Sequence, residues 1–201
     1  MKNLFSKNRV EAFSDGIFAI IVTLLVLEIK VPHIGDHHSA GELMAALKGL
    51  FPKFLSWIIS FFTVAVIWVN HHRIFKQIGQ LDNGIFWWNA VLLLWTSFIP
   101  FPTAVMGDYP GNPVSLVLYG LVMSLMAASF SFMRFYILRN PGLLEVSVDV
   151  MLFRKGTVMS VLFGPVMYLA GVAAGFLHPM LAFAVYLGIP VYFIFSENKK
   201  S

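Results

Sequence analysis

Six long apolar segments constrain the fold of this chain more than any other feature of its sequence. They cover approximately residues 10–31, 54–70, 84–105, 114–135, 157–176 and 180–195. A helix needs about 20 predominantly apolar residues to cross a bilayer. The second segment is the shortest, and residues 42–50 and 71–80 on either side can lengthen its helix. The pattern predicts an all-α integral membrane protein, a bundle of six transmembrane helices.

Composition supports the same class. Hydrophobic residues make up 58% of the 201 residues and charged residues only 12%, whereas soluble domains carry about 25% charged residues. Little sequence remains outside the apolar segments, so we expect a single six-helix transmembrane domain over residues 1–201 and no separate catalytic domain. The chain has no cysteine, which excludes disulfides and thiolate chemistry and leaves the redox compartment open.

Helix-breaking residues separate the apolar segments. Pro32 follows the first segment, residues 82–84 divide the second from the third, and several Pro and Gly residues between 102 and 113 predict a tight turn. Within the last two segments, Pro165 and Pro190 are expected to kink their helices. The first segment is too long for a signal peptide and lacks a cleavage site, so we interpret it as a retained helix.

The distribution of basic residues predicts the orientation. With the amino terminus in the cytoplasm, only three of the 14 Lys and Arg residues, Lys30, Lys48 and Lys53, fall on the outer side. Cytoplasmic loops carry such an excess of Lys and Arg. We therefore expect both termini in the cytoplasm, a basic surface facing anionic lipid, and no nucleic-acid site, because no basic run is dense enough.

The first apolar segment begins with polar and charged residues, among them Arg9, Ser14 and Asp15. A charge at membrane depth costs about 3 kcal/mol on insertion scales, so such residues face protein or water and mark a functional site. At 100° per residue, Ile20, Leu24 and Leu27 share one stripe with Thr23 on its edge. Ser14 and Asp15 lie about 120–140° away. The helix therefore has two faces with different environments.

The second helix offers partners for the polar face, because it ends in Asn70-His71-His72 on the side where the first helix begins. These residues are candidates to hydrogen-bond Ser14 and Asp15. Asp15 can also pair with Arg9 of the same or another subunit. A purely interfacial anchor at the helix start is an equally simple interpretation. A metal site of two histidines is disfavoured because adjacent helical residues point about 100° apart.

The motif Arg9-x-x-x-Phe13-Ser14-Asp15 resembles the signature of the Transmembrane Protein 175 family of potassium channels. Gly16, the pair Ile20 and Thr23, the run from Leu25 to Ile29, and Asn70-His71-His72 are also similar to its prokaryotic members. The resemblance implies one six-helix repeat per chain, a homotetramer, and a pore lined by the first helix of each subunit. It also implies a prokaryotic plasma membrane as the location.

The resemblance further implies roles for individual residues. Ile20 matches a hydrophobic constriction, Thr23 a hydroxyl layer and Leu27 a second apolar ring, and Leu24 lies on the same stripe. Arg9, Phe13, Ser14 and Asp15 match a polar network that holds the helix. The sequence contains no Thr-Val-Gly-Tyr-Gly filter. We expect passive conduction with K⁺ transiently near Thr23, modest selectivity over Na⁺, and no cofactor or protein substrate.

Other interpretations remain. The stripe that contains Ile20 and Thr23 also fits an ordinary helix-packing face. A secondary transporter of cations, including a proton-coupled one, would need coupling carboxylates near the membrane centre, and Asp15 lies close to the inner boundary. An enzyme is disfavoured because no Gly-x-Ser-x-Gly motif occurs and the His pair lacks a glutamate at metalloprotease spacing. A purely structural membrane subunit would conduct no ions.

Overall fold

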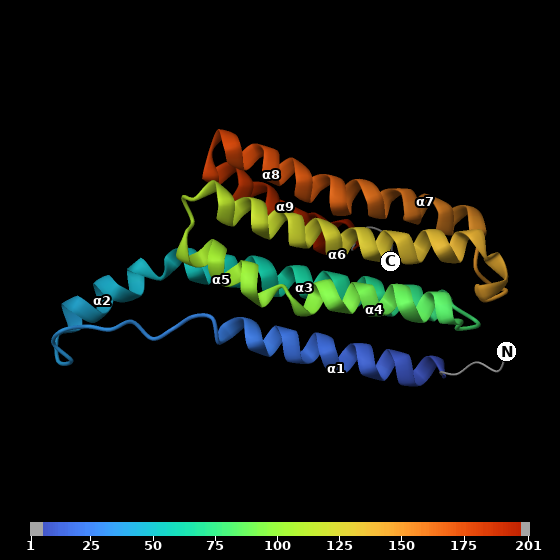
Figure 1. Cartoon of the computed structure of the whole chain (residues 1–201), viewed down its shortest axis with the longest axis horizontal. Helices are drawn as coiled ribbons and strands as arrows, with labels where there is room; N and C mark the ends of the chain where they lie inside the picture. The colour runs from blue at the N-terminus through green and yellow to red at the C-terminus, as the bar shows by residue number, and fades with distance from the viewer. Residues whose placement is uncertain (1–5, 198–201) are drawn as a thin grey trace.

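The computed structural model describes residues 6–197. Helices run side by side along one common axis and form an elongated bundle (Figure 1). Lys2, Lys199 and Lys200, which the orientation prediction places in the cytoplasm, lie outside the described residues. Within the described range, the structure is all-helical and its only extended pairing is an isolated bridge between Ile78 and Leu144.

The helices have the following bounds. They are α1 (Lys7–Val26), α2 (Ala40–Gly49), α3 (Phe51–Gln77), α4 (Asn83–Ser97), α5 (Pro100–Asp108), α6 (Pro113–Arg139), the 3₁₀ turn η1 (Pro141–Leu143), α7 (Val150–Val161), the π-helical turn η2 (Leu162–Val166), α8 (Met167–Leu177) and α9 (Pro179–Glu197).

Four helical stretches in the described part of the chain are long and apolar enough to cross a membrane. They are Phe51–Gln77, Asn83–Asp108, Pro113–Arg139 and Val150–Leu177, and a shorter apolar helix covers Pro179–Phe195. The first helix, α1, is 20 residues long and carries four charged residues near its start. The described part of the chain is therefore all-helical with four stretches able to cross a membrane, while the count of six spans stays a prediction.

The turn predicted between residues 102 and 113 is shorter in the structure. Pro102 and Gly107 lie inside α5, and the connection to α6 comprises only residues 109–112. Helix α5 begins at Pro100, and only two residues separate it from the end of α4 at Ser97. Proline is tolerated in the first turn of a helix, where the backbone N–H lacks an intrahelical partner in any case. Pro100 and Pro102 therefore start a new helical stretch instead of a loop.

The two other prolines singled out in the sequence lie within helices. Pro165 lies in η2, the π-helical turn that joins α7 to α8. Such a turn is a common response to a residue that interrupts the helical hydrogen bonds. The hydroxyl of Ser124 on α6 donates to the Pro165 carbonyl oxygen at 3.2 Å. Pro190 lies inside α9.

The core of the bundle forms around α6. This helix packs against α4, α5, α7 and α8, and 14 of its 27 residues are buried. Small residues allow close approach to its neighbours: the hydroxyl of Tyr186 occupies the space that a Cβ on Gly120 would need. The same tyrosine donates to the carbonyl oxygen of Leu116 at 2.9 Å. This contact holds α9 against α6.

Short contacts tie the loops at the end of the bundle where α3 and α6 terminate. The backbone N–H of Gly79 donates to Leu143 O at 2.9 Å, and that of Glu145 donates to Gln77 O at 2.9 Å. The Lys7 ammonium at the start of α1 donates to Ile78 O at 2.6 Å. The amino-terminal end of α1 is thereby fixed to the loop that follows α3.

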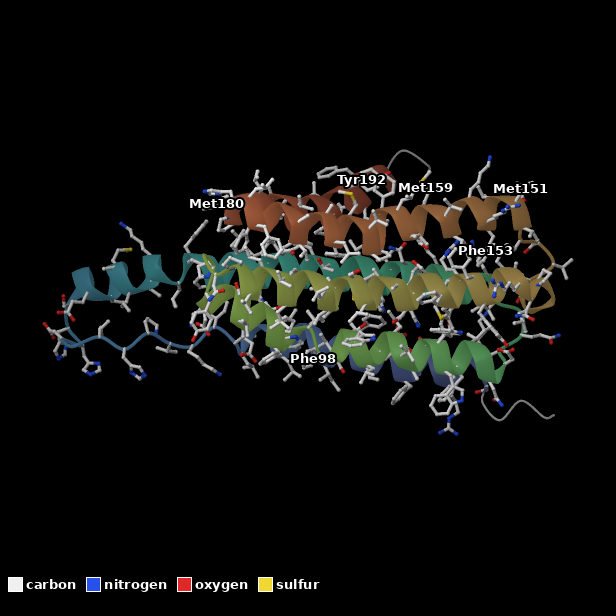
Figure 2. All side chains as sticks on the ribbon, turned by 45° about the horizontal axis from the view of Figure 1, so that its top comes forward. Phe98, Met151, Phe153, Met159, Met180 and Tyr192 are labelled. Atoms are coloured by element: carbon white, nitrogen blue, oxygen red, sulfur yellow. The ribbon has the colours of Figure 1, made fainter. Side chains whose placement is uncertain are left out.

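The outer surface of the bundle is rich in apolar side chains, as Figure 2 shows for Phe98, Met151, Met159 and Met180. Apolar surface of this extent is expected where lipid replaces water as the solvent. Helix α2 projects beyond the bundle at the end opposite to the start of α1 (Figure 1) and contains no buried residue.

Candidate functional site

Helix α1 lies at one edge of the bundle and is covered on one face only (Figure 1). It packs against α3, α4 and α5. Its buried residues, Val10, Ser14, Phe18, Ile21 and Leu25, recur every three or four positions and therefore form one continuous face. This periodicity identifies the side of α1 that its own subunit holds.

The predicted pore stripe lies on the uncovered side of α1. Ile20 is 59% exposed, Leu24 42% and Leu27 60%, and Thr23 is also exposed. One turn earlier, Gly16 has no atom within 4 Å of the position a Cβ would take. Every residue predicted to line a pore therefore points away from the subunit that carries it. The face is apolar except for one hydroxyl.

The Thr23 hydroxyl has a defined orientation. Its Oγ1 lies 2.8 Å from Ile20 O and 3.3 Å from Ala19 O, so its hydrogen is donated to the carbonyls of its own helix. A hydroxyl carries one donor hydrogen and two acceptor lone pairs. Because the hydrogen is engaged, the oxygen presents lone pairs to whatever lies against this face.

A buried chain of hydrogen bonds attaches the other face of α1. Asn89 on α4 donates from Nδ2 to Ser14 Oγ at 2.9 Å, and Ser14 Oγ donates to Val10 O at 2.8 Å. The Oδ1 of Asn89 lies 2.8 Å from His71 Nε2 on α3. Since an amide oxygen only accepts, this arrangement requires His71 to carry its hydrogen on Nε2. Ser14, His71 and Asn89 are each almost fully buried.

Aromatic rings pack around this chain. The His71 ring stacks on Phe75 with centroids 4.3 Å apart and meets Phe18 of α1 edge-on at 5.4 Å. Polar groups in a low-dielectric environment are costly unless all of them are paired. The three-helix contact between α1, α3 and α4 is therefore specified by hydrogen bonds as well as by packing.

Asp15 makes a second, more exposed attachment. The indole Nε1–H of Trp68 on α3 donates to Asp15 Oδ1 at 2.8 Å. Trp68 in turn stacks on His72 with ring centroids 6.3 Å apart. In the described part of the chain, Arg9 and Asp15 of the same subunit form no ion pair. The carboxylate is held by the indole.

The structure brings most of the predicted polar residues together but changes their direct partners. We expected Asn70, His71 or His72 to bond Ser14 and Asp15; instead Asn89 bonds Ser14 and Trp68 bonds Asp15. His71 is linked to Ser14 through Asn89, and His72 is linked to Asp15 through its stack on Trp68. His71 does not bond Ser14 directly because the amide of Asn89 lies between the His71 imidazole and the Ser14 hydroxyl.

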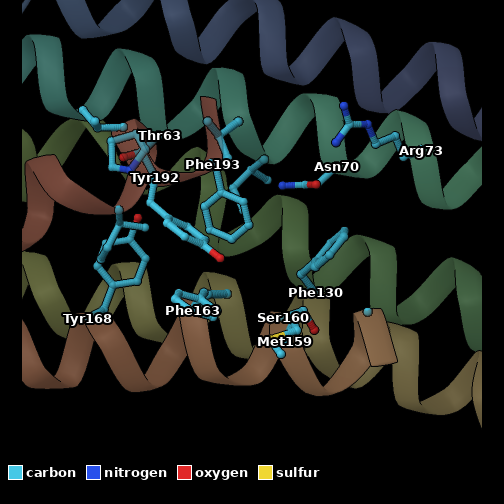
Figure 3. Close-up of a pocket in the computed structure, with 18 of the residues that line it drawn as sticks. Thr63, Asn70, Arg73, Phe130, Met159, Ser160, Phe163, Tyr168, Tyr192 and Phe193 are labelled. Carbon is cyan, nitrogen blue, oxygen red and sulfur yellow. The ribbon is translucent and has the colours of Figure 1, made fainter. Parts of the chain in front are cut away.

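The remaining predicted residues lie apart from this chain. Asn70 lines a cavity between α3, α6, α7, α8 and α9 (Figure 3). Arg9 and Phe13 are exposed on the subunit. Sequence reasoning missed Asn89 and Trp68, although a lone amide within the apolar segment 84–105 was a signal, because polar side chains inside a membrane rarely lack a function. Within residues 6–197, no group of three or more His, Asp or Glu side chains is placed to hold a metal ion.

Comparison with known proteins identifies the family. The family model described as "Endosomal/lysosomal potassium channel TMEM175" matches residues 9–100. A potassium channel of Chamaesiphon minutus is 37% identical over 197 residues, which cover 94% of each chain. This chain belongs to the TMEM175 family. The family assignment confirms the resemblance inferred from the first helix, and it makes the protein a member of a channel family and not an enzyme.

Two further comparisons define the extent of the likeness. The crystal structure of a lysosomal potassium-selective channel TMEM175 homolog from Chamaesiphon minutus superposes with a TM-score of 0.81 at 35% identity, covering 96% of this chain and 98% of that one. The endosomal/lysosomal proton channel TMEM175 of Homo sapiens is 32% identical over 133 residues, 62% of this chain and 26% of the human protein. The architecture is thus that of a bacterial TMEM175 channel.

Proposed function

We propose that this chain is the subunit of a homotetrameric potassium channel that conducts passively through a pore lined by α1 of each subunit. The observation that carries the proposal is the position of Ile20, Thr23, Leu24 and Leu27 on the face of α1 that the subunit leaves uncovered. Relatives named potassium channels over nearly the full length support the activity.

The proposal includes six spans in a single domain, with both termini in the cytoplasm of a prokaryotic plasma membrane. Helices α1 and α9 add to the four clear spans because they are 20 and 19 residues long. At a rise of 1.5 Å per residue they are about 30 Å long, the thickness of the hydrocarbon core. The charges at the start of α1 fit the membrane interface.

An exposed apolar face can also contact lipid, and α7 and α8 have such a face. The outward face of α1 differs because it carries Gly16 and the Thr23 hydroxyl between its aliphatic residues. Small and hydroxyl-bearing residues are typical of surfaces that meet other helices or water within a membrane. We therefore assign this face to the centre of an assembly and the face of α7 and α8 to lipid.

In the proposed pore, four Ile20 side chains form the narrowest apolar ring, which closes when water leaves it. One turn further out, four Thr23 oxygens offer lone pairs to a cation that has lost part of its hydration shell. K⁺ is dehydrated more easily than Na⁺, so K⁺ crosses this site preferentially and binds only transiently. Hydroxyl rings replace a hydration shell incompletely, which keeps the selectivity modest. No cofactor takes part.

The test is ion flux through the purified protein in liposomes, with K⁺ or Na⁺ as the permeant cation and no other gradient. We expect K⁺ flux that follows its electrochemical gradient, and Thr23→Val should lower the preference for K⁺ while leaving the tetramer intact. Ser97→Ala is the matched control, because the exposed Ser97 hydroxyl also donates to its own helix, at 2.8 Å to Leu94 O, but lies on α4.

Three results would overturn parts of the proposal. Flux that requires a counter-transported ion would make the protein a secondary transporter. An unchanged K⁺ preference in Thr23→Val would remove Thr23 from the site of selection. A stable dimer or monomer that still conducts would exclude the fourfold pore.

A further inference from the structure

Helix α3 carries two tryptophans on the side that meets α1, and their indole groups differ in one respect. Near the start of α1, the Trp68 indole N–H donates to Asp15 Oδ1 at 2.8 Å. The Nε1 of Trp57, towards the other end of α1, is buried and has no hydrogen-bond partner within residues 6–197. Eleven residues separate the two tryptophans, and at 100° per residue they lie on the same face of α3, within about 20°.

A carboxylate lies at the level of Trp57 as well. Helices α1 and α3 run in opposite directions (Figure 1), so the end of α1 meets the early part of α3. Glu28, two residues beyond the end of α1, lines one small cavity together with Trp57. In the described part of the chain, the Glu28 carboxylate forms no hydrogen bond or ion pair. A donor and an acceptor without partners therefore border the same space.

This cavity has the size of one water molecule. Its volume is about 10 Å³, and a water needs roughly 10–15 Å³. Its walls come from the end of α1, from α3 and from α5. The other two polar residues in the wall already have partners. Lys53 pairs with Asp108, and Thr103 Oγ1 donates to Ile99 O at 2.8 Å.

The chemistry of the indole and the carboxylate defines what can occupy the space between them. An indole N–H only donates a hydrogen bond, and a carboxylate only accepts. The occupant must therefore accept one hydrogen bond and donate another. A metal cation has no lone pair for the N–H, and a monatomic anion has no hydrogen for the carboxylate. Water satisfies both groups and fits the volume, and buried polar groups are costly unless they are paired.

We propose that this cavity is a binding site for a single water molecule, which accepts the Trp57 indole N–H and donates to the Glu28 carboxylate. The α1 segment is then attached to α3 at two levels about 16 Å apart, directly through Asp15 and through water at Glu28. Leu27, which is 60% exposed, immediately precedes Glu28. Glu28 and Trp57 are therefore positioning residues for the outward face at this end of α1.

The first experiment detects the water at the indole. Full-length protein with isotope-labelled tryptophan is studied by NMR in detergent micelles, and the Trp57 indole signal is assigned from its loss in Trp57→Phe. We expect magnetisation transfer between the Trp57 indole proton and a long-lived water. This transfer should be lost in Glu28→Met, which places an apolar side chain of similar length in the cavity. It should persist in Glu28→Gln, because the amide oxygen still accepts from water.

The Trp68 indole is the matched control in the same spectra. Its partner is Asp15, so its signal should change in Asp15→Ala and not in Glu28→Met. A Trp57 indole without contact to a long-lived water would refute the proposal. Transfer that is unaffected by Glu28→Met would refute it as well, because the water would then not depend on the carboxylate.

The second experiment measures whether the indole and the carboxylate act together. Trp57→Phe and Glu28→Met should each lower the melting temperature by about 2–4 °C, the shift expected for one lost hydrogen bond in a chain of this length. The double variant should lose little more than either single variant, whereas Trp57→Phe combined with Asp15→Ala should show the sum of the two losses. Additive losses for Trp57 and Glu28 would overturn the bridge between them.

K⁺ flux in liposomes tests the consequence for α1, and this part of the inference rests on the proposed function. Trp57→Phe and Glu28→Met should change the flux in the same direction and to the same extent, because both release the helix end that carries Leu27. If flux stays at the wild-type level while the water signal is lost, the two residues do not position α1. A wild-type protein that conducts no K⁺ would contradict the proposed function and would leave the NMR result unchanged.

Discussion

Helices α6 and α1 use their apolar side chains in opposite ways. In α6, 14 of 27 residues are buried, and this helix packs against α4, α5, α7, α8 and α9 within the subunit. In α1, five of 20 residues are buried, all on one face. The comparison shows that α6 holds the subunit together, whereas α1 is attached by one side and presents the other to a surface outside the subunit.

The two helices also differ in how they are attached. Contacts of α6 are mostly apolar and include close approaches at glycines such as Gly120. The attachment of α1 includes a buried hydrogen-bonded chain through Ser14, Asn89 and His71. Packing tolerates small shifts in position, but hydrogen bonds fix rotation. The polar chain therefore sets which face of α1 points outward.

The largest effect should come from the core of α6. Met123 is fully buried, and Met123→Ala should lower the free energy of unfolding by about 2–5 kcal/mol because it removes apolar contacts and leaves a void. Denaturant titration of the protein in detergent measures this loss. Leu121→Ala is the control on the same helix, since Leu121 is 43% exposed and its truncation should cost less than about 1 kcal/mol. Equal losses would show that burial in the subunit does not separate the two positions.

An intermediate effect is expected at the polar attachment of α1. Asn89→Ala removes the partner of both Ser14 and His71 and should cost about 1–3 kcal/mol, because two buried polar groups lose a hydrogen bond. Hydrogen exchange should increase in α1 more than in α6, and ion flux should fall as α1 loses its orientation. Ser97→Ala on the same helix serves as the control. Increased exchange confined to α6 would contradict the assigned role of Asn89.

Asp15→Ala should act in the same direction and more weakly, because its bond to Trp68 is exposed to solvent. We expect a loss of about 1 kcal/mol and reduced yield of the assembled channel, measured by size-exclusion chromatography. A fully assembled Asp15→Ala protein whose only change is in ion permeation would instead place Asp15 at the conduction path.

The smallest effect on the subunit is expected on the outward face of α1. Ile20 is 59% exposed, whereas the adjacent Ile21 is 2% exposed. Ile20→Ala should change the stability of the subunit by less than about 1 kcal/mol, yet it should raise K⁺ flux because it widens the apolar ring that closes the proposed pore. Ile21→Ala should markedly lower the stability of the subunit and should not specifically raise K⁺ flux. Equal effects of the two variants on stability and on K⁺ flux would contradict the distinction between the two faces of α1.

Much of this arrangement follows from the sequence, for identifiable physical reasons. The apolar segments and the helix-breaking residues between them locate the helices, because the thickness of the bilayer sets how many apolar residues a spanning helix needs. The stripe with Ile20 and Thr23 is visible because helical periodicity relates residues on one helix to each other. The motif around Ser14 and Asp15 already indicated the family, which the family model over residues 9–100 and relatives of nearly full length establish.

The partners of that motif were not predictable in the same way. Asn89 lies 75 residues from Ser14 along the chain. The sequence of neither segment determines how the two helices are rotated relative to each other, so it does not show which side chains meet. Trp68 was read only as part of an apolar stretch, although its indole N–H is a donor. Pro102 was expected in a turn because proline usually interrupts a helix. It lies inside α5 because a new helix begins at Pro100, a start that the sequence pattern does not reveal.

The direction of the Thr23 hydroxyl bears on how the proposed pore excludes anions. Chloride passing through a narrow site needs hydrogens directed at it, and the hydrogen of Thr23 is donated backwards to Ile20 O. A permeating anion would therefore meet only oxygen electron pairs and aliphatic carbon. In the proposed pore, the orientation of the four Thr23 hydroxyls would therefore favour cations over anions without an acidic residue on the wall.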